Sequence, residues 1–363
     1  MNVWPTVGAS PRSQARLREQ PEDFVVEELL SFEPDGQGEH VLLYVEKRLR
    51  NTTEVQRQLA ELAGVPARDV GFAGLKDRRA VTRQWFSVGL AGRPEPMWHT
   101  LEPSAGVRVL QVERHRRKLR RGVHRSNRFT LMLRSLVPQQ SELEAALARV
   151  RAQGVPNYFG PQRFGREGTT LAQARAWMAR GGRIGRERRS LYLSALRAHL
   201  FNQLLGARVR HGEWDRLEPG QVCQLDGSRS LFRCDKIDED IGDRLLRGDL
   251  HPALPLWGTG DDPGGPALRQ RYAQELSAEQ LCCEFLEEKG LAMGWRPARL
   301  WPDDFSWEFC DHDCLRLNFS LPPGGYATAV LAELVCCNDE REDKHQDKHQ
   351  DKHNNRTSES SSE

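Results

Sequence analysis

The sequence predicts an α+β fold with room for more than one domain. Helix signals and strand signals alternate along its 363 residues, and 38% of these residues are hydrophobic, which is enough to bury more than one core. No apolar stretch approaches the roughly 20 residues that a membrane-spanning helix needs. Residues 1–20 lack the apolar region of a secretory signal, so we expect a cytoplasmic protein with reduced thiols.

The first half of the chain alternates short strands with two capped helices. A capping box at Asn51–Glu54 begins one helix, which Gly64 ends, and a second box at Ser141–Glu144 begins another, which Gly154 ends. In the last strand of this half, Phe129 and alternate residues share one face. Strands are expected over 70–73, 81–88, 107–112 and 128–134.

The second half opens with a connection rich in glycine and proline at 156–165, and a second loop is expected at 258–265. Its clearest strand is 314–321, where four apolar residues alternate strictly with polar ones. Helices are expected over 194–210, 277–290 and 327–335.

Charge is distributed unevenly, although the formal net charge is only +2. Residues 338–363 form a polar tail without any apolar side chain, so we expect this tail to be disordered. Eight Lys or Arg side chains fall within 114–128, and five Arg fall within 180–189. Two such clusters favour a polyanionic partner such as nucleic acid, and the alternative is a solvated surface.

One short run carries the most chemistry. Between Gly71 and Trp85, a predicted strand leads into a glycine turn and then into Lys76 and Asp77. Neighbouring cations would hold Asp77 ionised, and an ionised aspartate can act as a nucleophile or a base. The alternative is a solvated surface turn. No P-loop, Ser-His-Asp set, HExxH or GxGxxG motif competes, and Cys310 with Cys314 lacks a second ligand pair, so no metal site is expected.

The run from Gly74 to Gln84 resembles the signature of the TruD family of tRNA pseudouridine synthases, G-x-K-D-x-x-A-x-T-x-Q. The segment Asn157–Gly165, NYFGPQRFG, is similar to a second motif of that family. Further segments match in the same order, at 21–28, 38–52, 115–129, 194–203, 254–258 and 321–328. The resemblance spans residues 15–335, nearly everything except the tail.

The resemblance implies roles for individual residues. Asp77 matches the catalytic aspartate, Lys76 supports it, and Arg18 occupies a basic position from which it would pair with Asp77. Four residues match positions around the target nucleotide: Phe24, Asn127, Phe129 (which would stack on the base) and Tyr326. Core packing is the alternative for the three aromatic residues. Ser126 stands where the family usually has glycine, and the Tyr326 hydroxyl needs a partner if it is buried.

The implied reaction moves no atoms in or out and transfers no electrons, so no metal or other cofactor is expected. The implied substrate is uridine 13 in the D-arm of tRNA, flipped into a pocket, and the partner is tRNA bound by a monomer. Side chains Arg116, Arg117 and Lys118 would contact phosphates. Two alternatives stay open: a non-catalytic RNA-binding or RNA-folding protein of the same fold, and an RNA glycosidase whose second acid is Glu22, Asp23 or Glu27.

The resemblance also implies a division into domains. A discontinuous pseudouridine-synthase-type catalytic domain with a mixed sheet would comprise 1–154 and 301–337. An α/β TRUD domain would be inserted at 155–300, and the tail would follow from 338.

Overall fold

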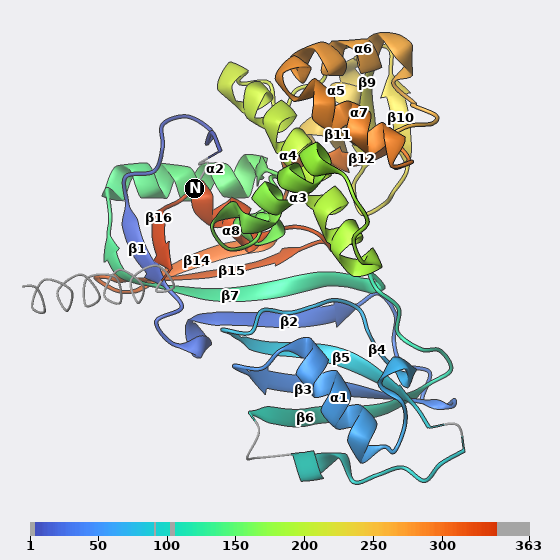
Figure 1. Ribbon diagram of the computed structural model, residues 1–363. Coiled ribbons are helices and arrows are strands. Elements are labelled where there is room, and N and C mark those ends of the chain that lie inside the picture. Colours follow the sequence, from blue (N-terminus) through green and yellow to red (C-terminus); the bar gives the residue numbers. More distant parts are fainter. Residues whose placement is uncertain (1–3, 91, 102–105, 340–363) are drawn as a thin grey trace, which may run out of the picture. The chain divides into compact units, whose positions relative to one another are not determined.

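A computed structural model describes residues 4–90, 92–101 and 106–339 (Figure 1). The chain forms two compact units. The first contains the residues up to Pro11, Gln140–Pro302 and Gly324–Leu334; the second contains Arg12–Gln139, Asp303–Pro323 and the residues from Val335 on. These bounds place 140–154 and 324–334 in the same unit as the middle of the chain. The division into a catalytic domain and an inserted domain, predicted above, stays a prediction. Within the described part, no helix combines the length and apolarity needed to cross a membrane.

The second unit is built on a ten-stranded mixed sheet (Figure 1). Its main path runs β14-β15-β7-β2-β5-β3-β6, with β1 joined to β7 and β16, and β4 joined to β5. The pairs β2–β5 and β1–β16 are parallel and the other pairs are antiparallel. The strands are β1 Gln14–Leu17, β2 Phe24–Leu30, β3 His40–Arg48, β4 Val70–Phe72, β5 Val81–Gly89, β6 Val107–His115, β7 His124–Val137, β14 Asp303–Asp311, β15 Cys314–Leu321 and β16 Cys336–Asp339. The predicted α+β class is confirmed.

Alternating side chains explain the centre of this sheet. Strand β15 has the predicted bounds, and it pairs with β7 so that Phe319 lies opposite Phe129 and Leu317 opposite Leu131. All four side chains are buried, which confirms the predicted faces. Strand β7 is longer than predicted because its polar N-terminal residues continue to pair with β2.

Helix α1, Thr52–Leu62, begins where the capping box predicts. The backbone N–H of Asn51 donates to Glu54 Oε2 at 3.1 Å, and its side-chain amide donates to Oε1 at 2.7 Å. Val55 and Leu59 of this helix are fully buried, in one core cluster with apolar side chains of β3 and β5. Their spacing of four residues puts both on the same face of the helix.

The first unit combines a four-stranded sheet, of order β10-β9-β11-β12, with a two-stranded sheet and most of the helices. Its strands are β8 Val155–Pro156, β9 Gln221–Leu225, β10 Leu231–Cys234, β11 Leu250–Leu256, β12 Gly294–Pro297 and β13 Arg299–Leu300. Its helices are α2 Gln140–Gln153, α3 Thr169–Arg180, α4 Arg186–His211, α5 Glu239–Arg247, α6 Gly265–Glu275, α7 Gln280–Glu288 and α8 Ala327–Ala332.

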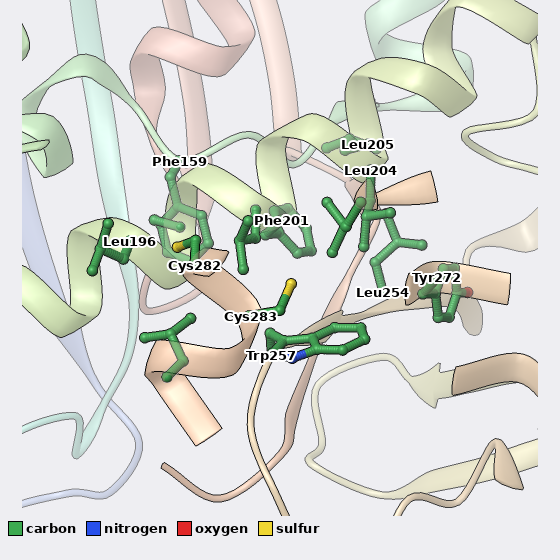
Figure 2. Packing of buried hydrophobic residues seen from close by; sticks show 14 of the residues in the cluster. Phe159, Leu196, Phe201, Leu204, Leu205, Leu254, Trp257, Tyr272, Cys282 and Cys283 are labelled. Carbon is green, nitrogen blue, oxygen red and sulfur yellow. The ribbon is translucent and has the colours of Figure 1, made fainter. Parts of the chain in front are cut away.

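Helix α4 supplies much of the core of the first unit (Figure 2). Its side chains Phe201 and Leu204 are buried in one cluster with Leu254 of β11 and Cys283 of α7. The helix begins at Arg186, eight residues before the predicted start. The sequence does not reveal this start, because the first turns of the helix are rich in arginine and carry no apolar period.

Strand β16 includes residues 338 and 339, the first two of the predicted tail. The rest of the predicted disordered tail, 340–363, lies outside the described residues.

Candidate active site

Asp77 lies in the loop between the short buried strand β4 and strand β5. Its backbone is fixed by Lys47 of β3, whose Nζ donates to the carbonyls of Asp77 and Arg50 at 2.8 Å each. Lys47 is fully buried, and this burial lowers its pKa to about 8, while the nearby Asp77 raises it in part. A buried ammonium that donates to two carbonyls sets the path of this loop.

The cation that contacts the Asp77 carboxylate is Arg18, whose Nη2 lies 3.2 Å from Asp77 Oδ2. The Asp77 side chain keeps 31% of its surface exposed, whereas that of Arg18 is buried. Arg18 follows β1 with a φ of 63°, a left-handed conformation that a non-glycine residue adopts only where its surroundings impose it. Its guanidinium also lies 3.9 Å from the centre of the Phe24 ring. Arg18 therefore joins the carboxylate to the aromatic core.

Three phenylalanines on neighbouring strands pack against one another, and the first of them is the Phe24 ring next to Arg18. The ring centres of Phe24 and Phe129 are 6.1 Å apart in an edge-on arrangement, and Phe129 stacks on Phe319 at 5.4 Å. Phe24 is only 2% exposed, and Phe129 is 8% exposed. Both rings thus pack in the core, and Phe129 is slightly less completely buried than Phe24.

Lys76 does not extend toward the Asp77 carboxylate. Its Nζ lies 2.5 Å from Glu28 Oε2, and both side chains are almost completely buried. The other oxygen of Glu28 accepts from the backbone N–H of Trp85 at 3.1 Å. The backbone N–H of Lys76 donates to Thr52 Oγ1 at 3.0 Å. Lys76 therefore anchors the loop through both its side chain and its backbone, and Arg18 is the cation in contact with the Asp77 carboxylate.

Asn127 on β7 is oriented by His124. The Asn127 Nδ2 lies 3.2 Å from His124 Nε2, and Asn127 Oδ1 is buried without a partner in the part of the chain described. Burial, together with the charge on Lys76, lowers the pKa of His124 to about 4. His124 is therefore neutral near pH 7 and can accept from the amide, which leaves the buried amide oxygen and one N–H without a partner among the described residues.

Tyr326 belongs to the first unit and directly precedes α8. Its hydroxyl accepts from Arg163 Nε at 3.1 Å, which supplies the partner that the sequence required. Its ring lies edge-on to Phe159, with ring centres 6.0 Å apart.

The basic residues 116–118 are exposed and border a cavity of about 760 Å³. Phe32 and His115 stack in its wall, with ring centres 4.6 Å apart. Lys118 Nζ also donates to the backbone carbonyl of Arg68. The cavity therefore combines an aromatic wall with a cationic rim.

Comparison with known proteins identifies the family. The family model described as tRNA pseudouridine synthase D (TruD) matches residues 6–181 and 173–334. The chain belongs to the TruD family. A tRNA pseudouridine synthase D of Methylococcus capsulatus is 49% identical over 327 residues, which cover 89% of this chain and 91% of that protein. One from Nitrosococcus oceani is 46% identical over 331 residues, covering 90% and 92%.

A solved structure shares the fold. The crystal structure of a Methanosarcina mazei protein assigned to tRNA pseudouridine synthase D has a TM-score of 0.65. The structural match covers 92% of this chain and 96% of the Methanosarcina mazei chain, at 21% sequence identity. The fold of this TruD chain is therefore that of a known family structure.

Sequence reasoning missed two contributors to the site of this TruD chain. Glu28 appears only within a matching motif, and its pairing with Lys76 depends on strands β2 and β5 being neighbours. His124 carries no sequence signal for its contact with Asn127. It precedes Asn127 by three residues, and this spacing puts two side chains on opposite faces of a regular strand. Among the described residues, no three His, Cys, Asp or Glu side chains gather as a metal site would require.

Proposed function

We propose that this TruD-family chain isomerises uridine to pseudouridine in tRNA, at uridine 13 of the D-arm, with Asp77 as the catalytic group. The observation that carries the proposal is the Asp77 carboxylate, which is partly exposed, contacted by Arg18, and placed in a loop whose backbone is bound by Lys47. The resemblance and the family membership supply the substrate. The cytoplasm as the compartment, and a monomer as the working form, stay predictions.

The reaction needs one carboxylate. It breaks the bond between N1 of uracil and C1′ of the ribose, turns the base and joins it again through C5. A carboxylate can attack C1′ or remove a proton from C2′, and both routes require Asp77 to be ionised and close to the ribose. Arg18 contacts and orients one oxygen of the carboxylate, which leaves the second carboxylate oxygen free of this contact.

Asn127 is suited to reading the uracil edge. A carboxamide that presents its oxygen and one N–H together can accept from N3–H of uracil and donate to an adjacent carbonyl oxygen. The bond to His124 occupies the other N–H and so holds the amide for this contact. Phe129, which is less completely buried than Phe24, is the aromatic that we propose for stacking on the base.

Each of the three carboxyls that could serve a glycosidase as its second acid is paired with an arginine. Glu22 contacts Arg48 at 2.7 Å, and the hydrogen bond from Arg48 lowers the pKa of Glu22. A general acid in a glycosidase needs the opposite change. The other two carboxyls also form ion pairs: Asp23 with Arg134 at 2.8 Å, and Glu27 with Arg83 at 2.5 Å. This supports rearrangement over hydrolysis.

The experiment is a pseudouridine map of tRNA by carbodiimide chemistry, made with the purified chain and without it. We expect a new signal at position 13, no change in the mass of the tRNA, and no free uracil. Released uracil would identify a glycosidase instead. Full tRNA binding without any new signal would identify a non-catalytic RNA-binding protein.

A further inference from the structure

The first unit contains two arginines that share an aromatic platform and have no acidic partner. The Arg163 and Arg296 guanidiniums lie 5.6 Å and 4.2 Å from the centre of the Phe159 ring. Across the described part of the chain, neither of them forms an ion pair with a carboxylate. The pKa of Arg296 is lowered to about 10, mainly by burial and to a smaller extent by the charge of Arg163, so Arg296 stays cationic at neutral pH. Two close cations without an anion leave a local excess of positive charge.

Each guanidinium is held in place and still has donors to spare. Arg296 donates from Nε and Nη2 to both oxygens of Asn157, at 3.1 Å and 2.5 Å, and from Nη2 to the carbonyl of Gly324 at 3.0 Å. Arg163 donates from Nε to the Tyr326 hydroxyl and from Nη1 to Ser194 Oγ, both at 3.1 Å.

The remaining nitrogens, Nη1 of Arg296 and Nη2 of Arg163, have no protein partner within the described ranges, and both residues are partly exposed. Each of these two nitrogens carries two N–H donors, so the pair offers four donors to a ligand.

A third donor group lies beside them. The Tyr326 hydroxyl accepts from Arg163, so its own hydrogen is available to donate. Tyr326 and Thr328 both lie against the backbone of Gly160, and the Thr328 hydroxyl oxygen is buried without a partner in the described chain. The Tyr326 hydroxyl therefore adds a hydrogen-bond donor beside the Arg163 guanidinium.

We propose that Arg163, Arg296 and the Tyr326 hydroxyl form a phosphate-binding site that takes one phosphodiester of the tRNA. Planar guanidiniums that point N–H donors outward match the oxygens of a phosphate. The proposal rests on the proposed function, because it names tRNA as the source of the phosphate. It also gives Tyr326 a polar role through its hydroxyl, in addition to any ring contact with the target nucleotide.

The test measures how tRNA affinity depends on salt. Arg163→Gln and Arg296→Gln are compared with the wild type between about 50 and about 200 mM salt, each in an Asp77→Asn background that prevents turnover. Loss of one phosphate contact should reduce the slope of log Kd against log salt concentration by about 0.7 to 0.9. Arg163→Lys, which keeps the charge, should keep the slope.

Arg269→Gln is the matched control. Arg269 also lies over an aromatic ring of the first unit, 5.0 Å from the centre of Trp257, but Glu287 neutralises it at 2.6 Å. Its replacement should leave the salt slope unchanged. Unchanged slopes for both test variants, with melting temperatures that show them to be folded, would overturn the site.

A second measurement uses the unaltered protein and so does not depend on the variants folding. Bound tRNA should protect Arg163 and Arg296, but not Arg269, from a dicarbonyl reagent, as read by mass spectrometry. Full modification of both in the complex would overturn the proposal. Inorganic phosphate at constant ionic strength that protects them as well as tRNA does would overturn the RNA backbone as the occupant.

The two proposals fail in different ways. A chain that shows these slopes but makes no pseudouridine would refute the proposed function and leave the phosphate site standing. A chain that makes pseudouridine while both slopes stay unchanged would refute only the site.

Discussion

Glu333 is a buried carboxyl whose protonation should control the stability of the first unit. It is 4% exposed, and the backbone N–H of Val7 donates to its Oε2 at 2.9 Å. Arg149 Nη2 lies 3.8 Å away, too far for a hydrogen bond. Burial raises the pKa of Glu333 to about 7 from the ordinary value of 4.5, against smaller opposing effects of Val7 and Arg149. The folded protein should therefore bind a proton that the unfolded chain has already released.

The sign and the size of the effect follow from this difference. Between pH 4.5 and about 7 the folded state holds more protons than the unfolded state, so stability falls as pH rises. The stabilisation is complete below the unfolded pKa and is lost as pH passes the folded pKa. A difference of about 2.5 in pKa, at about 1.4 kcal/mol for each unit, amounts to about 3.5 kcal/mol when the group is fully ionised in both states.

The assay is urea unfolding of the wild type and of Glu333→Gln at pH 5 and pH 8, followed by tryptophan fluorescence. Trp4, which stacks on Tyr158 at 5.8 Å, reports on the same unit. Glutamine can still accept from Val7 but does not ionise, so the variant should gain up to about 3.5 kcal/mol over the wild type at pH 8 and nearly nothing at pH 5. The control is Glu288→Gln, whose side chain is 69% exposed. Identical pH dependence of wild type and Glu333→Gln would refute the reasoning.

Three further changes test the second unit. Lys76→Met leaves the Glu28 carboxylate buried without its cation and should cost about 3–5 kcal/mol of unfolding free energy; a loss below about 1 kcal/mol in urea titrations would contradict the pairing. Arg18→Gln removes the donor that orients Asp77 and should lower kcat about tenfold or more with little change in tRNA Kd; an unchanged single-turnover rate would exclude this role. Replacing the basic residues 116–118 by glutamine should weaken tRNA binding and reduce the slope of log Kd against log salt concentration by the equivalent of up to about three phosphate contacts. An unchanged slope would show that these residues do not contact phosphates.

Some elements can be predicted from the sequence almost to their ends. The bounds of β15 are those of the alternating stretch 314–321, because burial of one face of a strand produces this period whichever strand pairs with it. The start of α1 follows from the capping box, since both of its hydrogen bonds join residues three apart in the chain. Signals of this kind are local and need no knowledge of the fold.

Other elements carry no such signal. The arginine-rich first turns of α4 face away from any core, so no apolar period reveals that the helix begins at Arg186. Strand β2, Phe24–Leu30, contains two adjacent glutamates, and one of them, Glu28, faces a buried lysine that comes 48 residues later. Its polarity makes sense only when the neighbouring strand is known.

The site shows the same division. The glycine turn places Asp77 at the end of a strand, and that much is legible in the sequence. The pairing of Arg18 with Asp77 is indicated by the family resemblance and not by any local pattern, because Arg18 lies 59 residues away in the chain. The bond between His124 and Asn127 depends likewise on the burial of the ring, which the sequence does not report.

The most direct measurement is single-turnover formation of pseudouridine in tRNA by the wild type and by Asp77→Asn at equal, saturating protein. With an amide in place of the reactive carboxylate, no product should form within many wild-type half-times, while the Kd for tRNA stays within a few-fold of the wild-type value. Product formation by the asparagine protein at the wild-type rate would show that the chemistry belongs to another residue.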